Sequence, residues 1–215
     1  MSRTPAASTD GTSASEPSQE SARSRTGQIG DLPVLITPMR RRHLRGVIAI
    51  EQQTNHRPWS LGLFMGELRM PTSRAYLVAL DRHRVVGFSG LMVTADEGHI
   101  TNIAVHPDYR RLGIAARLLL SSMDEAIERK VTGVTLEVRA TNTAAQELYR
   151  RFGFAPGGVR RNYYADLGED ALIMWAHDVD GPEYADRLGR IRTELIQSAA
   201  PAGGSARTST EQESR

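Results

Sequence analysis

Residues 102–115 read NIAVHPDYRRLGIA. The opening residues continue an apolar run rich in β-branched side chains, which predicts a strand that ends near Val105. Pro107 and Asp108 are typical turn residues, because proline fixes φ and aspartate hydrogen-bonds its own backbone. A helical spacing of apolar residues begins near Gly113. The stretch therefore predicts a strand, a tight turn and the start of a helix.

This turn has the composition of an anion-binding site. Small residues at Gly113 and Ala115 let a ligand approach the backbone and leave amide N–H groups free to point at an anion. The positive end of the helix dipole adds to the attraction. Arg110 and Arg111 can supply charge-assisted hydrogen bonds. An ordinary strand–turn–helix with a glycine at the helix start is the alternative that the local pattern leaves open.

Strands and helices are mixed along the chain on both sides of this turn. The hydrophobic spacing predicts strands at 33–37, 75–80, 85–93, 99–105, 134–139, 154–164 and 171–177. It predicts helices at 39–52, 60–69, 111–129, 142–153 and 182–197. This order predicts an α+β (mixed α/β) fold with one crossover through the long helix.

The two ends of the chain differ from this core. Residues 1–31 and 198–215 are rich in small and polar residues, so we expect two disordered tails around a domain at 32–178 and a C-terminal helix at 179–197. The N-terminal stretch lacks the apolar segment of a secretory signal peptide. No apolar run approaches the ~18–20 residues of a membrane-spanning helix. We therefore expect a cytoplasmic protein with no membrane partner.

The composition narrows the possible chemistry. The chain has no cysteine, which excludes a catalytic thiol and thiolate metal sites. Its net charge of +2 is too small by itself to indicate a nucleic-acid partner, and we expect none. Lys130 is the single lysine among 27 Lys and Arg residues. GC-rich codon usage is the simplest explanation, although arginine also suits phosphate. The histidines show no metal-ligand spacing, so we expect no metal.

The run Arg110-x-x-Gly113-x-Ala115 resembles the acetyl-coenzyme A signature of the GNAT superfamily, Arg/Gln-x-x-Gly-x-Gly/Ala. The resemblance implies a GNAT fold, with a central, twisted, mostly antiparallel sheet of about seven strands and flanking helices. It implies that acetyl-CoA, the co-substrate, lies in the splay between the fourth and fifth strands. The residues expected to contact it are Ile103, Ala104, Val105, Arg110, Arg111, Leu112, Gly113, Ile114, Ala115 and Ala116.

Two residues beyond the turn have side chains suited to acetyl transfer. Glu137 alternates with Leu136 and Val138, so it faces away from the apolar side of its strand. A glutamate in a cleft can take the proton that an amine must lose before it attacks a thioester, whereas one on an open sheet is merely solvated. Tyr149 could protonate a departing thiolate, since its reference pKa is about 10. Packing of its ring in the core is the alternative.

A wider set of residues is similar to the RimI family of ribosomal-protein-alanine N-acetyltransferases. The set comprises Pro58-Trp59-Ser60, Asn102-Ile103-Ala104-Val105, Leu136-Glu137-Val138-Arg139, Asn142, Leu148-Tyr149, Gly153-Phe154, Arg161-Asn162-Tyr163-Tyr164 and Glu169-Asp170-Ala171. By position, the resemblance makes Glu137 the proton acceptor and Tyr149 the proton donor. It makes Asn142 a contact of coenzyme A, a role compatible with capping its helix. It implies acetyl transfer to a protein N-terminus, with the N-terminal alanine of a small-subunit ribosomal protein favoured, by direct attack in a ternary complex.

The acceptor side is less constrained by the sequence. Trp59 is expected either to shape a peptide groove or to anchor the second helix. Tyr163 and Tyr164 lie on the predicted last hairpin, where related enzymes close over the substrate, although such a pair is also common without function. We expect a monomer or weak oligomer. A lysine or small-molecule amine acetyltransferase stays open, because the fold does not fix the acceptor. A second alternative that stays open is a catalytically weak regulatory module that binds acetyl-CoA.

Overall fold

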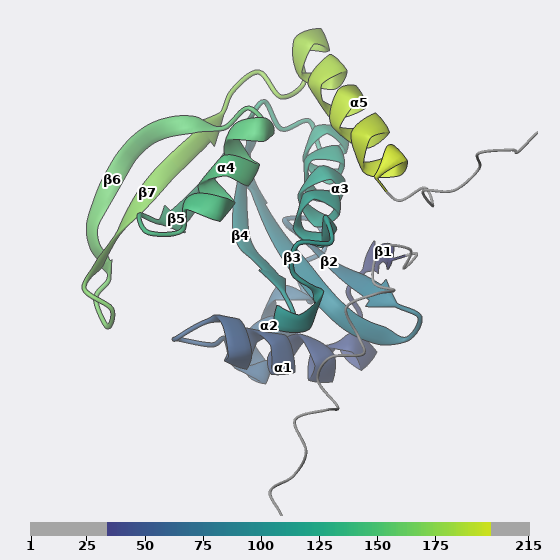
Figure 1. The fold of residues 1–215 in the computed structure, drawn as a ribbon, viewed down its shortest axis with the longest axis vertical. Helices are drawn as coiled ribbons and strands as arrows, with labels where there is room; N and C mark the ends of the chain where they lie inside the picture. The colour runs from purple at the N-terminus through teal and green to yellow at the C-terminus, as the bar shows by residue number, and fades with distance from the viewer. Residues whose placement is uncertain (1–33, 199–215) are drawn as a thin grey trace, which may run out of the picture.

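A seven-stranded sheet organises residues 34–198, the part of the chain that the computed structural model describes (Figure 1). The strands are β1 (Val34–Pro38), β2 (Arg74–Asp81), β3 (Arg84–Thr94), β4 (Glu97–Val105), β5 (Gly133–Arg139), β6 (Ala155–Tyr164) and β7 (Glu169–Ala176). The α-helices are α1 (Leu44–Thr54), α2 (Leu61–Glu67), α3 (Ile114–Glu128), α4 (Thr143–Arg151) and α5 (Pro182–Gln197). Two short 3-10 helices are η2 (Arg41–His43) and η3 (Pro107–Tyr109).

The strand order is β1-β2-β3-β4-β5-β7-β6. Every neighbouring pair is antiparallel except β4 and β5, which are parallel because α3 crosses over between them. The predicted mixed α/β fold, mostly antiparallel and with one crossover, is therefore confirmed. The β4–β5 pairing lasts only from Glu97↔Gly133 to His99↔Thr135. Beyond His99 the two strands diverge, which is the splay that the resemblance implied (Figure 1).

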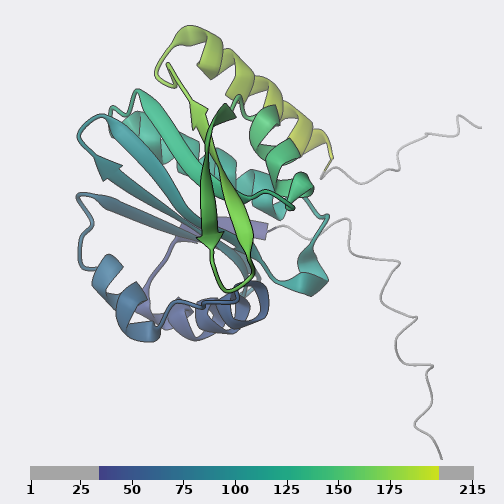
Figure 2. The same ribbon diagram turned by 90° about the vertical axis from the view of Figure 1, so that its left-hand side faces the viewer.

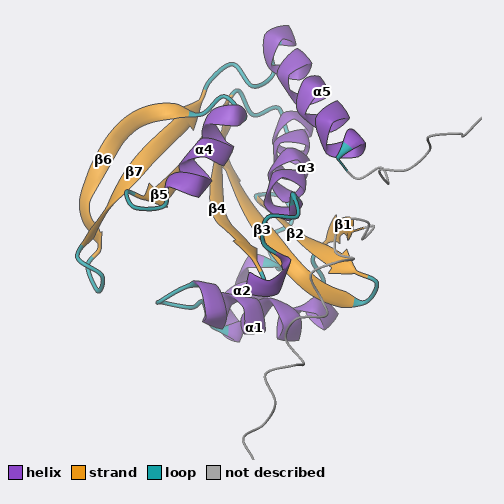
Figure 3. Cartoon of the chain, viewed as in Figure 1, coloured by secondary structure: helices purple, strands orange, loops and turns teal. Residues whose placement is uncertain are grey.

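Helices cover both faces of the sheet (Figure 3). On one face, α1 and α2 bury Val47, Ile50 and Phe64 against Tyr76 and Phe88 of the N-terminal strands. On the other face, α3 and α4 share one large apolar cluster with β3, β4, β5 and β7. Ser60 caps α2, since its Oγ accepts a hydrogen bond from the Leu63 N–H at 3.2 Å. Packing of helices on both faces holds β4 and β5 in place where the two strands diverge.

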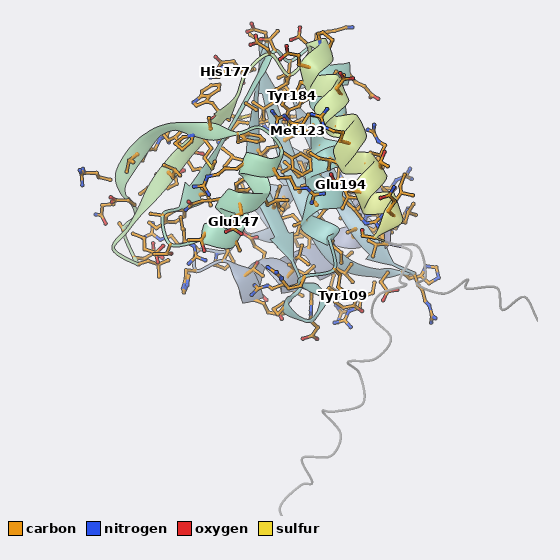
Figure 4. All side chains as sticks on the ribbon, turned by 45° about the horizontal axis from the view of Figure 1, so that its top comes forward. Tyr109, Met123, Glu147, His177, Tyr184 and Glu194 are labelled. Carbon is orange, nitrogen blue, oxygen red and sulfur yellow. The ribbon has the colours of Figure 1, made fainter. Side chains whose placement is uncertain are left out.

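The C-terminal helix α5 is docked on the second layer. Tyr184, Leu188, Ile191 and Leu195 all belong to the cluster of α3 and α4. The Tyr184 hydroxyl donates a 2.7 Å hydrogen bond to the carbonyl of Phe152. Tyr184 lies in the first turn of α5 (Figure 4). The C-terminal helix that the sequence predicts is therefore part of the core.

Two helix starts differ from the sequence prediction. The long helix begins at Ile114 instead of residue 111, because Arg111 and Gly113 have left-handed φ values of 65° and 72°. The first helix begins with η2 and becomes α-helical only at Leu44, because Met39 still donates a backbone hydrogen bond to Tyr76 of β2. The predicted tails at 1–31 and 198–215 lie outside the described residues, apart from Ser198.

Candidate active site

The splay leaves one edge of β4 without a strand partner. Ile103, Ala104 and Val105 pair with β3 only, because the β5 ladder has already ended at His99. Their backbone groups that point away from β3 are therefore free to hydrogen-bond an extended ligand. A bulge at Thr101, where the pairing shifts by one residue, bends the strand next to this edge.

The turn after β4 presents free amides. The first intrahelical hydrogen bond of α3 runs from Arg117 N–H to the Gly113 carbonyl at 3.1 Å. The N–H groups of Ile114, Ala115 and Ala116 precede it, so they have no helical acceptor and carry the positive end of the helix dipole. These are the elements of a phosphate cradle.

Glycine at 113 is required by the backbone conformation and not by crowding. Its φ of 72° is a value that L side chains rarely adopt, and the nearest atom to an added Cβ is Leu195 Cδ2 at 3.7 Å. Arg110 and Arg111 are exposed on the same turn and form no ion pair within residues 34–198. Both are therefore available to an anion.

Glu137 is held between two cationic or cation-forming groups. Its Oε2 lies 2.6 Å from Nε2 of His99 on β4, and its Oε1 lies 3.2 Å from Nη1 of Arg160 on β6. The side chain is only 9% exposed, so it is not a solvated sheet residue. The alternation of β5 puts it on the face opposite Leu136 and Val138, which are buried against the helices. The carboxylate is thus fixed at the splay instead of moving freely.

Sequence reasoning missed both partners of this carboxylate. The parallel register sets His99 opposite Thr135, two residues before Glu137, so the two side chains share a face. The signal in the sequence was His99 itself, a histidine on the strand before β5. It indicates a partner for Glu137 only once the register of β4 and β5 is known. Arg160 lies on β6, and its approach depends on the curvature of the last hairpin.

Tyr149 is buried on α4. Its ring lies 5.9 Å from that of Phe154, and its hydroxyl makes no hydrogen bond within residues 34–198. Burial, with a smaller contribution from Tyr164, raises the pKa of Tyr149 to about 12. The pKa of Tyr164 is itself raised, first by burial and then by Tyr163 and Glu137. Tyr164 therefore lies in the electrostatic neighbourhood of both Tyr149 and Glu137.

Two polar side chains border the same region. The Oδ1 of Asn142 accepts a 3.2 Å hydrogen bond from Ala145 N–H and so caps α4, which leaves its amide N–H₂ available. Asn102 lies on β4, opposite Gly90 of β3. Its Oδ1 is buried and has no hydrogen-bond partner among residues 34–198. An unpaired buried oxygen costs about 1–3 kcal/mol, so it points to a bound water or ligand group.

Two loops meet through an ion pair between Arg57 and Asp166. Trp59, in the α1–α2 loop, donates its backbone N–H to the buried carboxylate of Glu51 at 3.2 Å and packs 5.4 Å from the Phe64 ring. The Trp59 side chain is thus anchored on the α2 cluster while it stays partly exposed. In the same loop, Arg57 pairs at 3.3 Å with Asp166, which lies between β6 and β7 (Figure 2).

The predicted tyrosine pair sits just before this contact. The rings of Tyr163 and Tyr164 are 5.2 Å apart, and Tyr163 is 47% exposed whereas Tyr164 is half-buried. The structure thus brings Glu137, Tyr149 and Tyr164 into one region, and Tyr163 adjoins it through Arg160, which lies over the Tyr163 ring and pairs with Glu137. Trp59 has no contact with these side chains among the interactions of residues 34–198.

Comparisons with known proteins fit this arrangement. The model of the "Acetyltransferase (GNAT) family" matches residues 42–154, which include the splay, the turn, Glu137 and Tyr149. The chain belongs to the GNAT acetyltransferase family.

Within that family, its relatives include N-terminal acetyltransferases. The chain is 42% identical over 127 residues to the "[Ribosomal protein bS18]-alanine N-acetyltransferase" of Salmonella typhimurium, a match that covers 58% of this chain and 84% of the relative. The crystal structure of the ribosomal-protein-S18-alanine N-acetyltransferase from Escherichia coli superposes with a TM-score of 0.62 at 35% identity, covering 67% of this chain and 94% of that one. Ard1 from Thermoplasma volcanium gives 0.62 at 27% identity, covering 67% and 97%. The resemblance noted from the sequence is confirmed.

No helix among residues 34–198 is long and apolar enough to cross a membrane. No group of three or more His, Asp or Glu side chains in that range could hold a metal ion.

Proposed function

We propose that the chain transfers an acetyl group from acetyl-CoA to the α-amine of a protein N-terminus, and that the N-terminal alanine of ribosomal protein bS18 is its acceptor. The names of the relatives support the acceptor, and the splay supports the donor. The observation that carries the proposal is Glu137, a nearly buried carboxylate fixed by His99 and Arg160 where β4 and β5 diverge.

The residues present fit acetyl-CoA, which supplies the acetyl group as a thioester. The free amides of Ile114, Ala115 and Ala116 suit its pyrophosphate, and Arg110 and Arg111 add charge. The unpaired edge of β4 at Ile103, Ala104 and Val105 suits the amides of its pantetheine arm. The remaining predicted contacts, Leu112, Gly113 and Asn142, lie on the same turn and at the start of α4.

Proton transfer divides between two side chains. Glu137 takes the proton that the amine loses as its nitrogen bonds to the acetyl carbon, directly or through a water held near Asn102. The C–S bond breaks and Tyr149 gives its proton to the sulfur. The raised pKa of Tyr149 keeps that proton in place at neutral pH.

An α-amine suits this base better than a lysine does. The pKa of an α-amine is about 7.7–8, whereas that of lysine is about 10.4. A carboxylate near pH 7 therefore meets many more neutral α-amines than neutral lysines. Trp59, Tyr163 and Tyr164 would hold the backbone of the acceptor, which meets the enzyme in the cytoplasm. Catalysis on this proposal needs one copy of the chain and no metal.

The test offers the full chain acetyl-CoA and a panel of peptides that differ in the first residue, together with a lysine peptide blocked at its N-terminus. We expect the fastest transfer to the peptide with N-terminal alanine, and none to the blocked peptide. Exclusive acetylation of the blocked peptide's lysine would overturn the proposal.

A further inference from the structure

A second pocket lies on the α1 side of the sheet, away from the splay. Its volume is about 420 Å³, and it is formed by η2, α1, the turn between β2 and β3, and the residue that follows β4. Its polar lining is almost entirely basic or imidazole, and none of its lining residues is acidic. The cationic pocket, as we call it, is lined by Arg42, His43, Arg45, His83, Arg84 and His106.

The arginines of the cationic pocket, Arg42, Arg45 and Arg84, form no ion pair within residues 34–198. The carboxylates next to the pocket are Asp108, whose Oδ2 lies 3.8 Å from Nδ1 of His106, and Asp81, the cross-strand partner of Arg84. By contrast, Arg129 and Arg192 on α3 and α5 each pair with a carboxylate at 2.7 Å. Three guanidinium groups around one hollow repel each other, and an anion between them would relieve that repulsion.

His43 shows the same lack of acceptors. The backbone N–H of Arg40 lies 3.1 Å from its Nδ1, and Nε of Arg42 lies 3.2 Å from its Nε2. A neutral imidazole has one acceptor nitrogen, so only one of these two donors can be satisfied. Burial, and then the charges of Arg42 and Arg40, lower the pKa of His43, so further positive charge is already disfavoured there.

His106, which also lines the pocket, repeats this arrangement. The N–H of Asp108 lies 3.3 Å from its Nδ1, and Nη2 of Arg84 lies 3.2 Å from its Nε2. One of the two donors again lacks an acceptor in either tautomer. With the proton on Nε2, each imidazole and its neighbouring arginine, Arg42 or Arg84, present N–H groups in the pocket that an external acceptor could satisfy.

We propose that the cationic pocket binds a phosphate group, either of a small molecule or of a nucleic-acid backbone. A phosphate offers several acceptor oxygens and at least one negative charge, which matches the excess of donors and of positive charge. The planar guanidinium fork favours phosphate geometrically. The volume also suits a phosphate with an attached group, since ligand pockets span about 300–1,000 Å³.

This site is separate from the one proposed for acetyl-CoA. The residues of the amide-bearing turn, Arg111–Ala116, do not line the cationic pocket, and His106 alone adjoins both. The proposal therefore does not depend on the proposed function.

The test uses the full chain and follows the imidazole N–H signals of His43 and His106 by NMR. Inorganic phosphate should shift both signals in a saturable way, whereas chloride at equal ionic strength should not. The double variant Arg42→Gln/Arg84→Gln should weaken phosphate binding at least 10-fold, because it removes two guanidinium groups that would donate to the phosphate. Both side chains are exposed, so we expect the variant to fold. Arg190→Gln, an exposed arginine on α5, is the matched control and should bind as the wild type does.

A second arm separates the sources. A single-stranded RNA oligonucleotide that binds tighter than inorganic phosphate, and loses that advantage in the double variant, identifies the ligand as a nucleic-acid backbone. Equal or weaker binding of the RNA identifies a small phosphate. Absence of saturable phosphate shifts would overturn the proposal. So would a double variant that loses affinity for CoA but not for dephospho-CoA, because the pocket would then belong to the CoA site.

Discussion

At the scale of single residues, Glu137 is held by its surroundings and not by its own strand. The alternation of β5 only turns it away from the helices, while His99 and Arg160 come from strands on either side. Both contacts fix the position of the carboxylate. On the proposed function, a base already held in one position loses little entropy when the amine arrives.

Replacing Glu137 with Gln keeps the side-chain size and removes the base. We expect kcat to fall about 10²- to 10⁴-fold, the usual contribution of a general base, with little change in acetyl-CoA affinity. Steady-state kinetics and calorimetric titration of acetyl-CoA measure the two effects. Glu147→Gln, an exposed position on α4, is the matched control and should leave both unchanged. Turnover that survives in Glu137→Gln would exclude this residue as the base.

Tyr149 should act as an acid over the whole neutral and mildly alkaline range. A tyrosine loses its proton as pH rises through its pKa, and here burial raises that pKa to about 12. The kcat of the wild type should therefore not decline between about pH 8 and about pH 10, whereas Tyr149→Phe should lower kcat about 100-fold at every pH. Tyr184→Phe loses a buried hydrogen bond to Phe152 and should cost stability but not kcat. A fall of the wild-type profile well below pH 10 that is absent from Tyr149→Phe would contradict this assignment.

At the scale of elements, the turn between β4 and α3 depends on two left-handed residues, Arg111 and Gly113. They reverse the chain so that α3 starts with its free amides at the splay. The turn is thus a strained connection that gives the helix N-terminus its direction.

Gly113→Ala should distort this turn without a steric clash. An added Cβ has room, but the left-handed backbone costs a non-glycine residue about 1–2 kcal/mol. We expect a lower free energy of unfolding by that amount and a higher KM for acetyl-CoA. Gly189→Ala, within α5 and with no neighbour near its Cβ, should instead stabilise by about 0.5–1 kcal/mol. Equal effects of the two substitutions on stability and KM would refute a special role for Gly113.

The sequence predicted these elements better than it predicted their contacts. The strands were found because their apolar side chains alternate, and α5 was found with the bounds that the structure gives it. The start of α3 was predicted near Gly113 from the turn, which agrees with Ile114, but the range 111–129 begins three residues early because nothing local marks Arg111 as left-handed. The contact of His99 with Glu137 could not be predicted, since it depends on the register of two strands separated by a whole helix.

At the scale of the whole molecule, α5 extends the core beyond the segment that the family model matches. It packs on α3 and α4, and Arg117 near the start of α3 donates a 2.8 Å hydrogen bond to the carbonyl of Leu195. The end of α5 therefore lies against the same turn that presents the free amides. This contact couples the docking of α5 to the geometry of the turn.

Leu188→Ala should destabilise the protein by about 2–5 kcal/mol, because it empties a buried position between α5 and the core. Chemical denaturation followed by circular dichroism measures the change. Ile196→Ala, on the same helix but 63% exposed, is the matched control and should shift stability by no more than about 0.5 kcal/mol. A small effect of Leu188→Ala would mean that α5 is not part of the cooperative core.

The loop of Trp59 meets the β6–β7 hairpin through the ion pair between Arg57 and Asp166. The central claim is that the site at the splay acetylates an α-amine and not a lysine. One peptide with a free N-terminal alanine and an internal lysine tests it most directly, because both amines compete within the same molecule. Mass spectrometric mapping after reaction with the full chain and acetyl-CoA should place the acetyl group on the alanine nitrogen, and Glu137→Gln should slow formation of that product about 10²- to 10⁴-fold. Acetylation of the lysine in preference to the alanine would contradict the claim.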